Sequence, residues 1–357
     1  MVTHAELEAL AQELGIDVIG CTAAGAYEET ERHIGERRAR GLFADMRFTM
    51  ARPETSCHPK TLLPGARSVV SAALCYYTPG PEPGPGEGRL PRYTWWDAYA
   101  VLRTRLEALA SRLGGTSRVL VDENDHVDRE GAARAGVGFY GKNTMLITRR
   151  FGSWVALGTI VSDVEIEPTP ALRLDCGDCR LCVDACPTGA LDEPGVLDAT
   201  RCLSYWTQSS SEPPGEIREA LGDRVYGCDT CQDVCPWNRG VEKRRADVPL
   251  AAGAEPVVSL RAWLETSPSE LRARYRRLFV PRNDGRFLLR NALVAAASSG
   301  DPALVPVVER LAEGDDGLLA RTAAAVLPRL RPGSDSHHRP GNEEVADSGR
   351  ARSEPAS

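Results

Sequence analysis

The sequence lacks the features of a membrane protein, an exported protein or a general nucleic-acid binder. No apolar run approaches the roughly 18–20 residues that a helix needs to span a bilayer. The first residues carry neither a basic segment nor a twin arginine, so we expect no export signal and a cytoplasmic protein. Basic residues are not in excess, because 43 Lys and Arg face 50 Asp and Glu. The net charge of −7 argues against indiscriminate binding of nucleic acid but leaves room for a local basic patch.

The composition is that of an ordinary globular chain, with 42% hydrophobic and 26% charged residues. A length of 357 residues suggests two or three domains. In the first part, helical and strand patterns interleave without the regular spacing of βαβ units, which predicts an α+β domain over residues 1–167. The expected helices are 5–14, 28–41 and 97–113, the expected strands are 17–20, 66–77, 118–122 and 155–161, and a Pro- and Gly-rich loop covers 79–91.

The remainder divides by composition into three further parts. A cysteine-rich segment covers residues 168–240, and a helical region covers 241–330. Three helical runs, at 286–297, 302–312 and 317–327, predict either a HEAT-like helical pair with a preceding helix or a plain helical cap. Residues 331–357 have almost no apolar side chains, so we expect a disordered tail in which His337 and His338 are solvated rather than bound to metal.

Eleven cysteines in a chain without an export signal argue against a disulfide framework and favour metal or redox chemistry. Eight of them lie between Cys176 and Cys235. The segment CGDCRLCVDACP (176–187) fits the C-x2-C-x2-C-x3-C-P run of bacterial ferredoxins, whose fourth cysteine binds the neighbouring cluster. Cys202 and the segment CDTCQDVCP (228–236) supply the remaining four.

This spacing predicts two [4Fe–4S] clusters with crossed ligands. One cluster takes Cys176, Cys179, Cys182 and Cys235, and the other takes Cys186, Cys202, Cys228 and Cys231. A pair of zinc ribbons is the alternative, because C-x2-C is also a zinc spacing, but zinc has no use for the two Cys-Pro ends. Outside this segment, Cys21 and Cys75 are expected in the core, and Cys57 beside His58 is a weak candidate for a reactive pair.

Several stretches, taken together, carry a resemblance to a known family. They are PKTLLPGARSVV (59–70), RAGVGFYGKNTMLIT (134–148), GSWVALG (152–158), CPTGAL (186–191), RCLSYWTQ (201–208) and YGCDTCQDVCPWN (226–238). They resemble epoxyqueuosine reductase, the cobalamin-dependent enzyme of queuosine biosynthesis, from near the N-terminus to about Leu330. The resemblance implies a nitroreductase-like cobalamin-binding domain, a two-cluster ferredoxin-like domain and a C-terminal helical HEAT-like region.

The resemblance also implies a reaction: reduction of the epoxide of epoxyqueuosine in tRNA to queuosine, with electrons passing through two [4Fe–4S] clusters to cobalamin. The oxygen leaves as water, so a proton donor is required. The family's acid is an Asp at a strand end, which matches Asp122 in RVLVDENDHVD. From the residues alone, Asp122 reads as a solvated carboxylate that competes with Glu123, Asp125 and Asp128; a buried site would raise its pKa.

Three departures from the family pattern leave the cluster cysteines untouched but allow an altered substrate or activity. Glu123 follows Asp122 where the family has Ser or Thr. Asp97-Ala98-Tyr99 stands where the family commonly has Asp-Tyr-His. Ser56 stands where some members have Arg.

Cobalamin contacts are implied by the same resemblance. Besides Asp122, they are Asn143, Leu146, Leu157, Ser204 and Asp229. Leu146 and Leu157 fit plain strand core nearly as well. A D-x-H-x-x-G motif is missing, so we expect no histidine ligand to cobalt. Lys142 is a candidate for a phosphate of the cofactor or of RNA, although a GK pair without a full P-loop is weak evidence.

A local basic stretch is a candidate surface for tRNA. Residues 272–290 hold seven arginines interleaved with Tyr275, Phe279 and Phe287, which suits phosphate contact with base stacking. Arginines lying over the core are the alternative. A second, weaker patch consists of Arg37, Arg38 and Arg40.

Two other functions compete with this interpretation. A reductive dehalogenase also couples cobalamin to two [4Fe–4S] clusters but usually carries a twin-arginine signal. A ferredoxin-type electron carrier needs neither cobalamin nor an acid. For the favoured function, the expected partners are the tRNA anticodon stem-loop that carries epoxyqueuosine and an unidentified reductant such as a flavodoxin or ferredoxin. We expect a monomer with no membrane partner.

Overall fold

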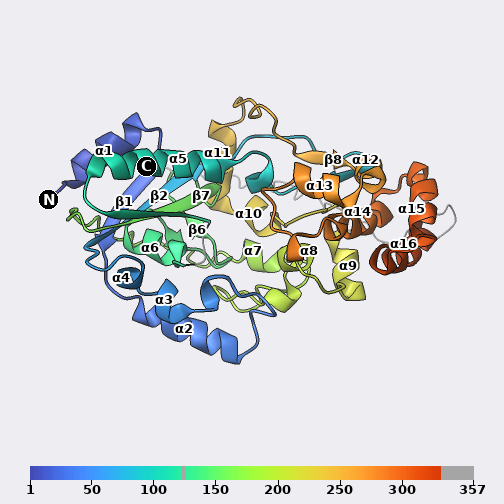
Figure 1. The fold of residues 1–357 in the computed structure, drawn as a ribbon, viewed down its shortest axis with the longest axis horizontal. Helices are drawn as coiled ribbons and strands as arrows, with labels where there is room; N and C mark the ends of the chain where they lie inside the picture. The colour runs from blue at the N-terminus through green and yellow to red at the C-terminus, as the bar shows by residue number, and fades with distance from the viewer. Residues whose placement is uncertain (123–124, 331–357) are drawn as a thin grey trace, which may run out of the picture.

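The computed structural model describes residues 1–122 and 125–330 (Figure 1). Its first part is built on a four-stranded antiparallel sheet in the order β1-β2-β7-β4. These strands are β1 (Val18–Ala23), β2 (Ser68–Cys75), β7 (Val155–Ser162) and β4 (Ser117–Val121). Every residue of β2 and β7 is buried, which explains why both read as continuous runs of apolar and small side chains.

Helices cover both faces of this sheet. Helix α5 (Ala98–Leu113) packs on β7 and β4, and α6 (Asp128–Arg134) packs on β1, β2 and β7 from the opposite side (Figure 1). Gly158 of β7 allows α5 to approach closely, because a Cβ at this position would lie 2.6 Å from Leu106 and 3.0 Å from Val121. The outer helices are α1 (His4–Glu13), α2 (Glu28–Ala39), α3 (Pro53–Ser56) and α4 (Pro59–Leu62).

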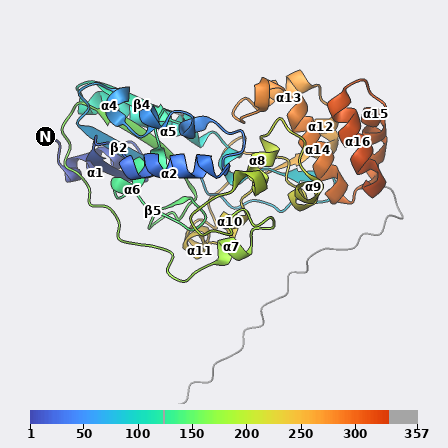
Figure 2. The ribbon, with the colours of Figure 1, turned by 90° about the horizontal axis from the view of Figure 1, so that it is seen from below.

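The cysteine-rich segment consists of short helices joined by loops. They are α7 (Leu181–Asp184), α8 (Leu203–Thr207), α9 (Gly215–Leu221), α10 (Thr230–Asp233) and α11 (Pro236–Arg244). Figure 2 shows α8 between the sheet and the C-terminal helices and α9 beside those helices; both contact α14 (Arg286–Ser299). Pro236 begins α11, so the second Cys-Pro pair starts a helix whose N-cap is Cys235.

The C-terminal region is a layered group of helices. It contains α12 (Leu260–Glu265), α13 (Pro268–Arg274), α14, α15 (Val305–Ala312) and α16 (Gly317–Leu330). Helix α14 contacts α12, α13 and α16, and its residues from Phe287 to Ala296 are all buried. The three predicted helical runs are therefore confirmed as α14, α15 and α16, while their assignment as a HEAT-like pair stays a prediction.

The expected strands and helices of the first part are present within a few residues of their predicted bounds. The prediction that residues 79–91 form only a loop is wrong, because β3 (Glu87–Arg89) forms inside this segment and pairs with β8 (Val257–Ser259). The following residues Leu90 and Trp95 belong to the hydrophobic core of the C-terminal helices. A strand whose partner lies so far along the chain leaves no local pattern in the sequence. Helix α6 was also missed.

Some sequence predictions, on the domain bounds and the C-terminal tail, stay predictions. The bounds 1–167, 168–240 and 241–330 stay a prediction, although Val241 packs in the core of the sheet domain. The predicted tail 331–357, with His337 and His338, lies outside the described residues. Within the part of the chain that the structure describes, no helix is both long and apolar enough to cross a membrane.

One arginine of the predicted tRNA surface is instead a structural residue. Arg290 of α14 is 1% exposed. Its guanidinium donates to the backbone carbonyls of Ser209 (2.8 Å), Ser211 (2.8 Å) and Trp206 (3.1 Å). These bonds tie α14 to the loop that follows α8, and burial lowers the pKa of Arg290 to about 10. This side chain has no surface to offer to RNA.

We predict that Arg290→Leu lowers the free energy of unfolding by roughly 3 kcal/mol or more, because it leaves several buried carbonyl groups without donors. Urea unfolding followed by tryptophan fluorescence measures the change. Arg276→Leu is the matched control, since Arg276 is exposed, and it should alter stability by less than about 0.5 kcal/mol. Equal stability of the two variants would contradict the anchoring role.

Candidate functional site

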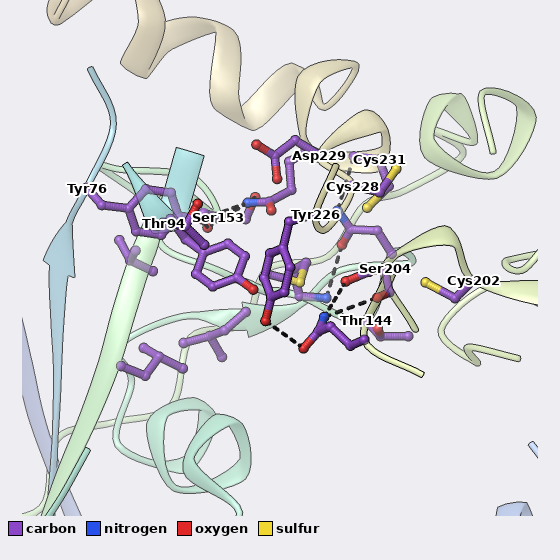
Figure 3. Close-up of a pocket in the computed structure, with 18 of the residues that line it drawn as sticks. Tyr76, Thr94, Thr144, Ser153, Cys202, Ser204, Tyr226, Cys228, Asp229 and Cys231 are labelled. Carbon is purple, nitrogen blue, oxygen red and sulfur yellow. Dashed lines mark hydrogen bonds between the residues drawn. The ribbon is translucent and has the colours of Figure 1, made fainter. Parts of the chain in front are cut away.

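A cavity of about 820 Å³ lies where the sheet domain meets the cysteine-rich segment. Tyr76 of the strand region and Asp229 and Cys231 of the cysteine-rich segment line it from different sides (Figure 3). All predicted cobalamin contacts are among the lining residues: Asp122, Asn143, Leu146, Leu157, Ser204 and Asp229. The tertiary fold therefore gathers residues that are more than one hundred positions apart in the sequence.

Four of the eight clustered cysteines also line this cavity, namely Cys186, Cys202, Cys228 and Cys231. Figure 3 shows Cys202, Cys228 and Cys231 together on the side away from Tyr76. The other four, Cys176, Cys179, Cys182 and Cys235, line a separate cavity of about 460 Å³. This division matches the two crossed ligand sets that the spacing predicts. Among the described residues, no three His, Cys, Asp or Glu side chains gather closely enough to hold a single metal ion.

The turn between β5 (Phe139–Tyr140) and β6 (Leu146–Ile147) contacts both groups of cysteines. Asn143, 4% exposed, donates its side-chain amide to the carbonyl of Cys231 at 3.3 Å. The ammonium of Lys142 donates to the carbonyls of Gly177 (2.6 Å) and Cys179 (3.0 Å). Lys142 was predicted to meet a phosphate, but here it fastens the first cysteine loop and lines the smaller cavity.

Asp122 directly follows β4 and lines the larger cavity, with its backbone in the left-handed region at φ 55°. The residue is accessible from the cavity, and the surrounding protein raises its pKa to about 6, chiefly by burial and then by the like charge of Asp128. Arg103 opposes this shift. A carboxyl group with such a pKa holds its proton closer to neutral pH than an ordinary aspartate does. Glu123, the first departure from the family pattern, lies outside the described residues.

The other two departures, Ser56 and Ala98-Tyr99, lie among the described residues. Ser56 is buried and donates its hydroxyl to the carbonyl of Thr49 at 2.7 Å. Asp97 caps α5 by accepting from the backbone N–H of Ala100 at 2.9 Å. Tyr99, in the first turn of this helix, lines the larger cavity; burial raises its pKa, and the charge of Asp122 adds to this shift.

The wall of the larger cavity contains a polar residue that the sequence did not predict, Tyr226, beside the predicted contact Asp229. The hydroxyl of Tyr226, which is 2% exposed, shares its one proton between the side-chain oxygen of Gln208 at 3.1 Å and the carbonyl of Phe279 at 3.0 Å. Asp229 accepts from the backbone N–H of Arg92 at 2.7 Å, and burial raises its pKa to about 6. Tyr226 lies beside the cysteines of the motif YGCDTC, which was the only signal for it in the sequence.

The remaining candidates from the sequence are mostly structural. Burial raises the pKa of the Cys57 thiol to about 11, and His58 pairs with Glu31 at 2.8 Å, so these two do not form a reactive pair. In the predicted arginine patch, Arg37, Arg38 and Arg40 bond to Gly195, Met50 and Glu193 respectively. Cys21 and Cys75 are buried in the core, as predicted.

The predicted tRNA stretch 272–290 is divided between core and surface. Tyr275 and Phe287 are buried like Arg290. Arg274 pairs with Glu255, and Arg286 pairs with two aspartates. Arg276, Arg277, Phe279 and Arg282 are exposed, and among the described residues these three arginines form no ion pair; Arg277 and Phe279 line the larger cavity.

Two family models match the chain. Residues 175–238 match the 4Fe-4S double cluster binding domain. Residues 57–127 match the model of epoxyqueuosine reductase QueG. The cysteine-rich segment is thus a double [4Fe–4S] cluster domain rather than a pair of zinc ribbons.

Curated relatives and solved structures agree with these matches. Epoxyqueuosine reductases of Staphylococcus aureus and Bacillus subtilis are each 33% identical, over 88% and 90% of this chain and 85% of theirs. A crystal structure of an epoxyqueuosine reductase with an epoxyqueuosine-modified tRNA-Tyr stem loop has a TM-score of 0.83 and 32% identity, covering 91% of this chain and 89% of that one. The Streptococcus thermophilus structure gives 0.82 and 29%, covering 93% and 91%. The chain therefore belongs to the epoxyqueuosine reductase family.

Proposed function

We propose that this protein reduces the epoxide of epoxyqueuosine in tRNA to the alkene of queuosine, with two [4Fe–4S] clusters and cobalamin as cofactors. One observation carries the proposal: Asp122, the five other predicted cofactor contacts and four cluster cysteines all line one cavity. A plain electron carrier would need no such cavity beside its cluster. Family membership favours this reaction over reductive dehalogenation.

The two groups of cysteines fit the two clusters. Cys176, Cys179, Cys182 and Cys235 would hold the cluster of the smaller cavity, and Cys186, Cys202, Cys228 and Cys231 would hold that of the larger one. Bound clusters supply electrons one at a time. Because the second group shares its cavity with the predicted cofactor contacts, we assign to it the last step of electron delivery, and to the first group the contact with a flavodoxin- or ferredoxin-type donor.

The lining of the larger cavity suits a cobalamin. Its volume of about 820 Å³ is toward the upper end of the range of ligand pockets. Leu146 and Leu157 offer an apolar wall, whereas Asn143, Ser204 and Asp229 offer polar groups at its other edges. Cobalamin supplies a low-valent cobalt centre that is a strong reductant toward an epoxide carbon.

Conversion of the epoxide to an alkene consumes two electrons and two protons and releases the oxygen as water. Asp122 is the residue to which we assign proton donation to the departing oxygen, since it lines the cavity and its pKa is about 6. Asp128 supports this role by keeping the proton on Asp122 through like-charge repulsion. A solved Bacillus subtilis relative is described with an aspartate-bearing catalytic loop swung out of its active site, which is compatible with a mobile acid.

The substrate is a nucleotide within tRNA, which also assigns the protein to the cytoplasm. The relative solved with a modified tRNA stem loop supports this partner. We further propose that the protein acts as a monomer.

We predict that Cys202→Ala loses one cluster, so that anaerobically prepared protein contains about four rather than about eight irons per chain. Iron analysis and the visible absorption near the cluster band measure the loss. Cys75→Ala is the control, because Cys75 is buried in β2 away from both cavities, and it should retain all the iron. Unchanged iron in Cys202→Ala would refute the ligand assignment.

Asp122→Asn should retain both clusters and bound cobalamin but reduce turnover by about 10²–10⁴-fold, the range expected for loss of a general acid. The conversion of epoxyqueuosine in a tRNA stem loop, followed by mass spectrometry of the digested RNA, measures the rate. Full activity in this variant would remove Asp122 from the mechanism.

The rate should also depend on pH through Asp122. A general acid acts while protonated, so kcat should fall as pH rises through about 6, where Asp122 loses its proton. Asp97, Asp128, Tyr99, Arg103 and Tyr226 are ionisable groups around it. Asp128→Asn removes a like charge and should move the descending limb to lower pH.

Asp247→Asn is the control for this shift, because Asp247 is exposed and does not line the cavity. It should leave the pH profile unchanged. A profile that Asp128→Asn does not move would contradict the electrostatic coupling of the two aspartates.

A further inference from the structure

Two exposed aromatic side chains meet at the rim of the larger cavity. Phe48 is 36% and Phe279 is 51% exposed, and both also line the cavity. Their rings touch edge to face, with centroids 5.5 Å apart and planes at 66°. The two come from distant segments, the short 3-10 turn η1 (Phe48–Met50) and the loop after α13. The proposed reaction gives no role to this exposed aromatic pair at the cavity entrance.

The backbone beneath these rings is held in place. Tyr226 donates its hydroxyl to the carbonyl of Phe279 at 3.0 Å, and Arg277 donates to the carbonyl of Thr94 at 2.6 Å. Phe48 adopts φ 33°, a value that a bulky side chain rarely takes. Ser56 donates its hydroxyl to the carbonyl of Thr49, next to Phe48, at 2.7 Å. The main chain is therefore held beside both rings, which stay exposed.

The charge around this pair is positive. Arg47 precedes Phe48, and Arg276 and Arg282 flank Phe279 in the sequence; all three are exposed. Over residues 1–122 and 125–330, no ion pair or hydrogen bond engages their guanidinium groups. Of the nearby acids, Asp284 pairs with Arg286 and also feels the charge of Arg282, which helps to lower its pKa, and Asp45 accepts from Tyr205.

We propose that the exposed face of Phe279, braced by Phe48, stacks on an unpaired base of the RNA loop next to the nucleotide that enters the cavity, while Arg276 and Arg282 contact the adjoining phosphates. This inference rests on the proposed function. Aromatic rings beside free guanidinium groups bind single-stranded RNA, because every unstacked base offers a π-face and every linkage a negative charge. In a paired RNA stem the base faces are already stacked on each other. The pair of Phe48 and Phe279, the stacking platform, therefore binds the RNA loop and not the RNA stem.

The test measures binding of a fluorescent anticodon stem loop to the protein carrying its clusters and cobalamin. Phe279→Leu should weaken binding about tenfold or more, within the range that loss of one base–aromatic stack gives. Phe279→Tyr should bind like the unaltered protein, because a phenol ring stacks equally well. Leu250→Ala is the matched control, as Leu250 is 41% exposed and does not line the cavity; it should bind normally.

Two further measurements separate stacking from charge. A blunt RNA duplex should bind Phe279→Leu and the unaltered protein equally. Arg276→Gln and Arg282→Gln should each reduce the salt dependence of stem-loop binding by about one unit of slope, which Phe279→Leu should not do. Iron content and the visible spectrum verify that each variant is folded and loaded.

The outcomes distinguish this inference from the proposed function. If the unaltered protein reduces epoxyqueuosine in the stem loop and Phe279→Leu binds that RNA with the same affinity, the stacking platform is wrong and the function stands. In a second outcome, Phe279→Leu binds RNA normally. If it also accepts electrons from reduced flavodoxin more slowly than the unaltered protein does, but from dithionite at the same rate, the rim binds the protein donor instead. If the unaltered protein neither binds nor converts the stem loop, both proposals fail.

Discussion

The structure depends on hydrogen bonds that hold two cysteine-bearing loops in place, because these loops have little regular structure of their own. Their helices are four to nine residues long, too short to be stable alone. Hydrogen bonds from outside fix them instead: Lys142 and Asn143 fasten the cysteine loops from the sheet domain, and Arg290 fastens the loop after α8 from the C-terminal helices. The cysteine-rich segment is thus held between two larger parts that each have their own hydrophobic core.

The larger cavity is a consequence of this arrangement. Asp122 stands at the end of a strand in the sheet domain, whereas Ser204, Asp229 and four cysteines reach the same space from the cysteine-rich segment. Neither part alone encloses it. Because protein surrounds the cavity, burial dominates its electrostatics and raises the pKa of both Asp122 and Asp229 to about 6. The packing that joins the two parts therefore also sets the proton affinity of the groups between them.

The arginine-rich stretch shows how one sequence pattern serves two purposes. Arg290 lies on the buried side of α14 and bonds to carbonyl groups, Arg274 pairs with Glu255, and Arg276 remains in water. Composition alone gave all seven arginines the same candidate role. What separates them is the direction each side chain takes from its helix or loop, and whether an acceptor of the protein lies within reach. Only those without such an acceptor keep a free charge for RNA.

The sequence by itself determined the elements and the chemistry: the sheet strands, the C-terminal helices, and a double-cluster spacing of eight cysteines. These are local signals, because periodicity and ligand spacing are written within a few consecutive residues. Tertiary structure alone decided that β3 forms and pairs with β8, that Lys142 bonds to the first cysteine loop, and that Tyr99 and Phe279 reach the cavity. Those features arise from contacts between distant segments, and no short stretch of sequence encodes them.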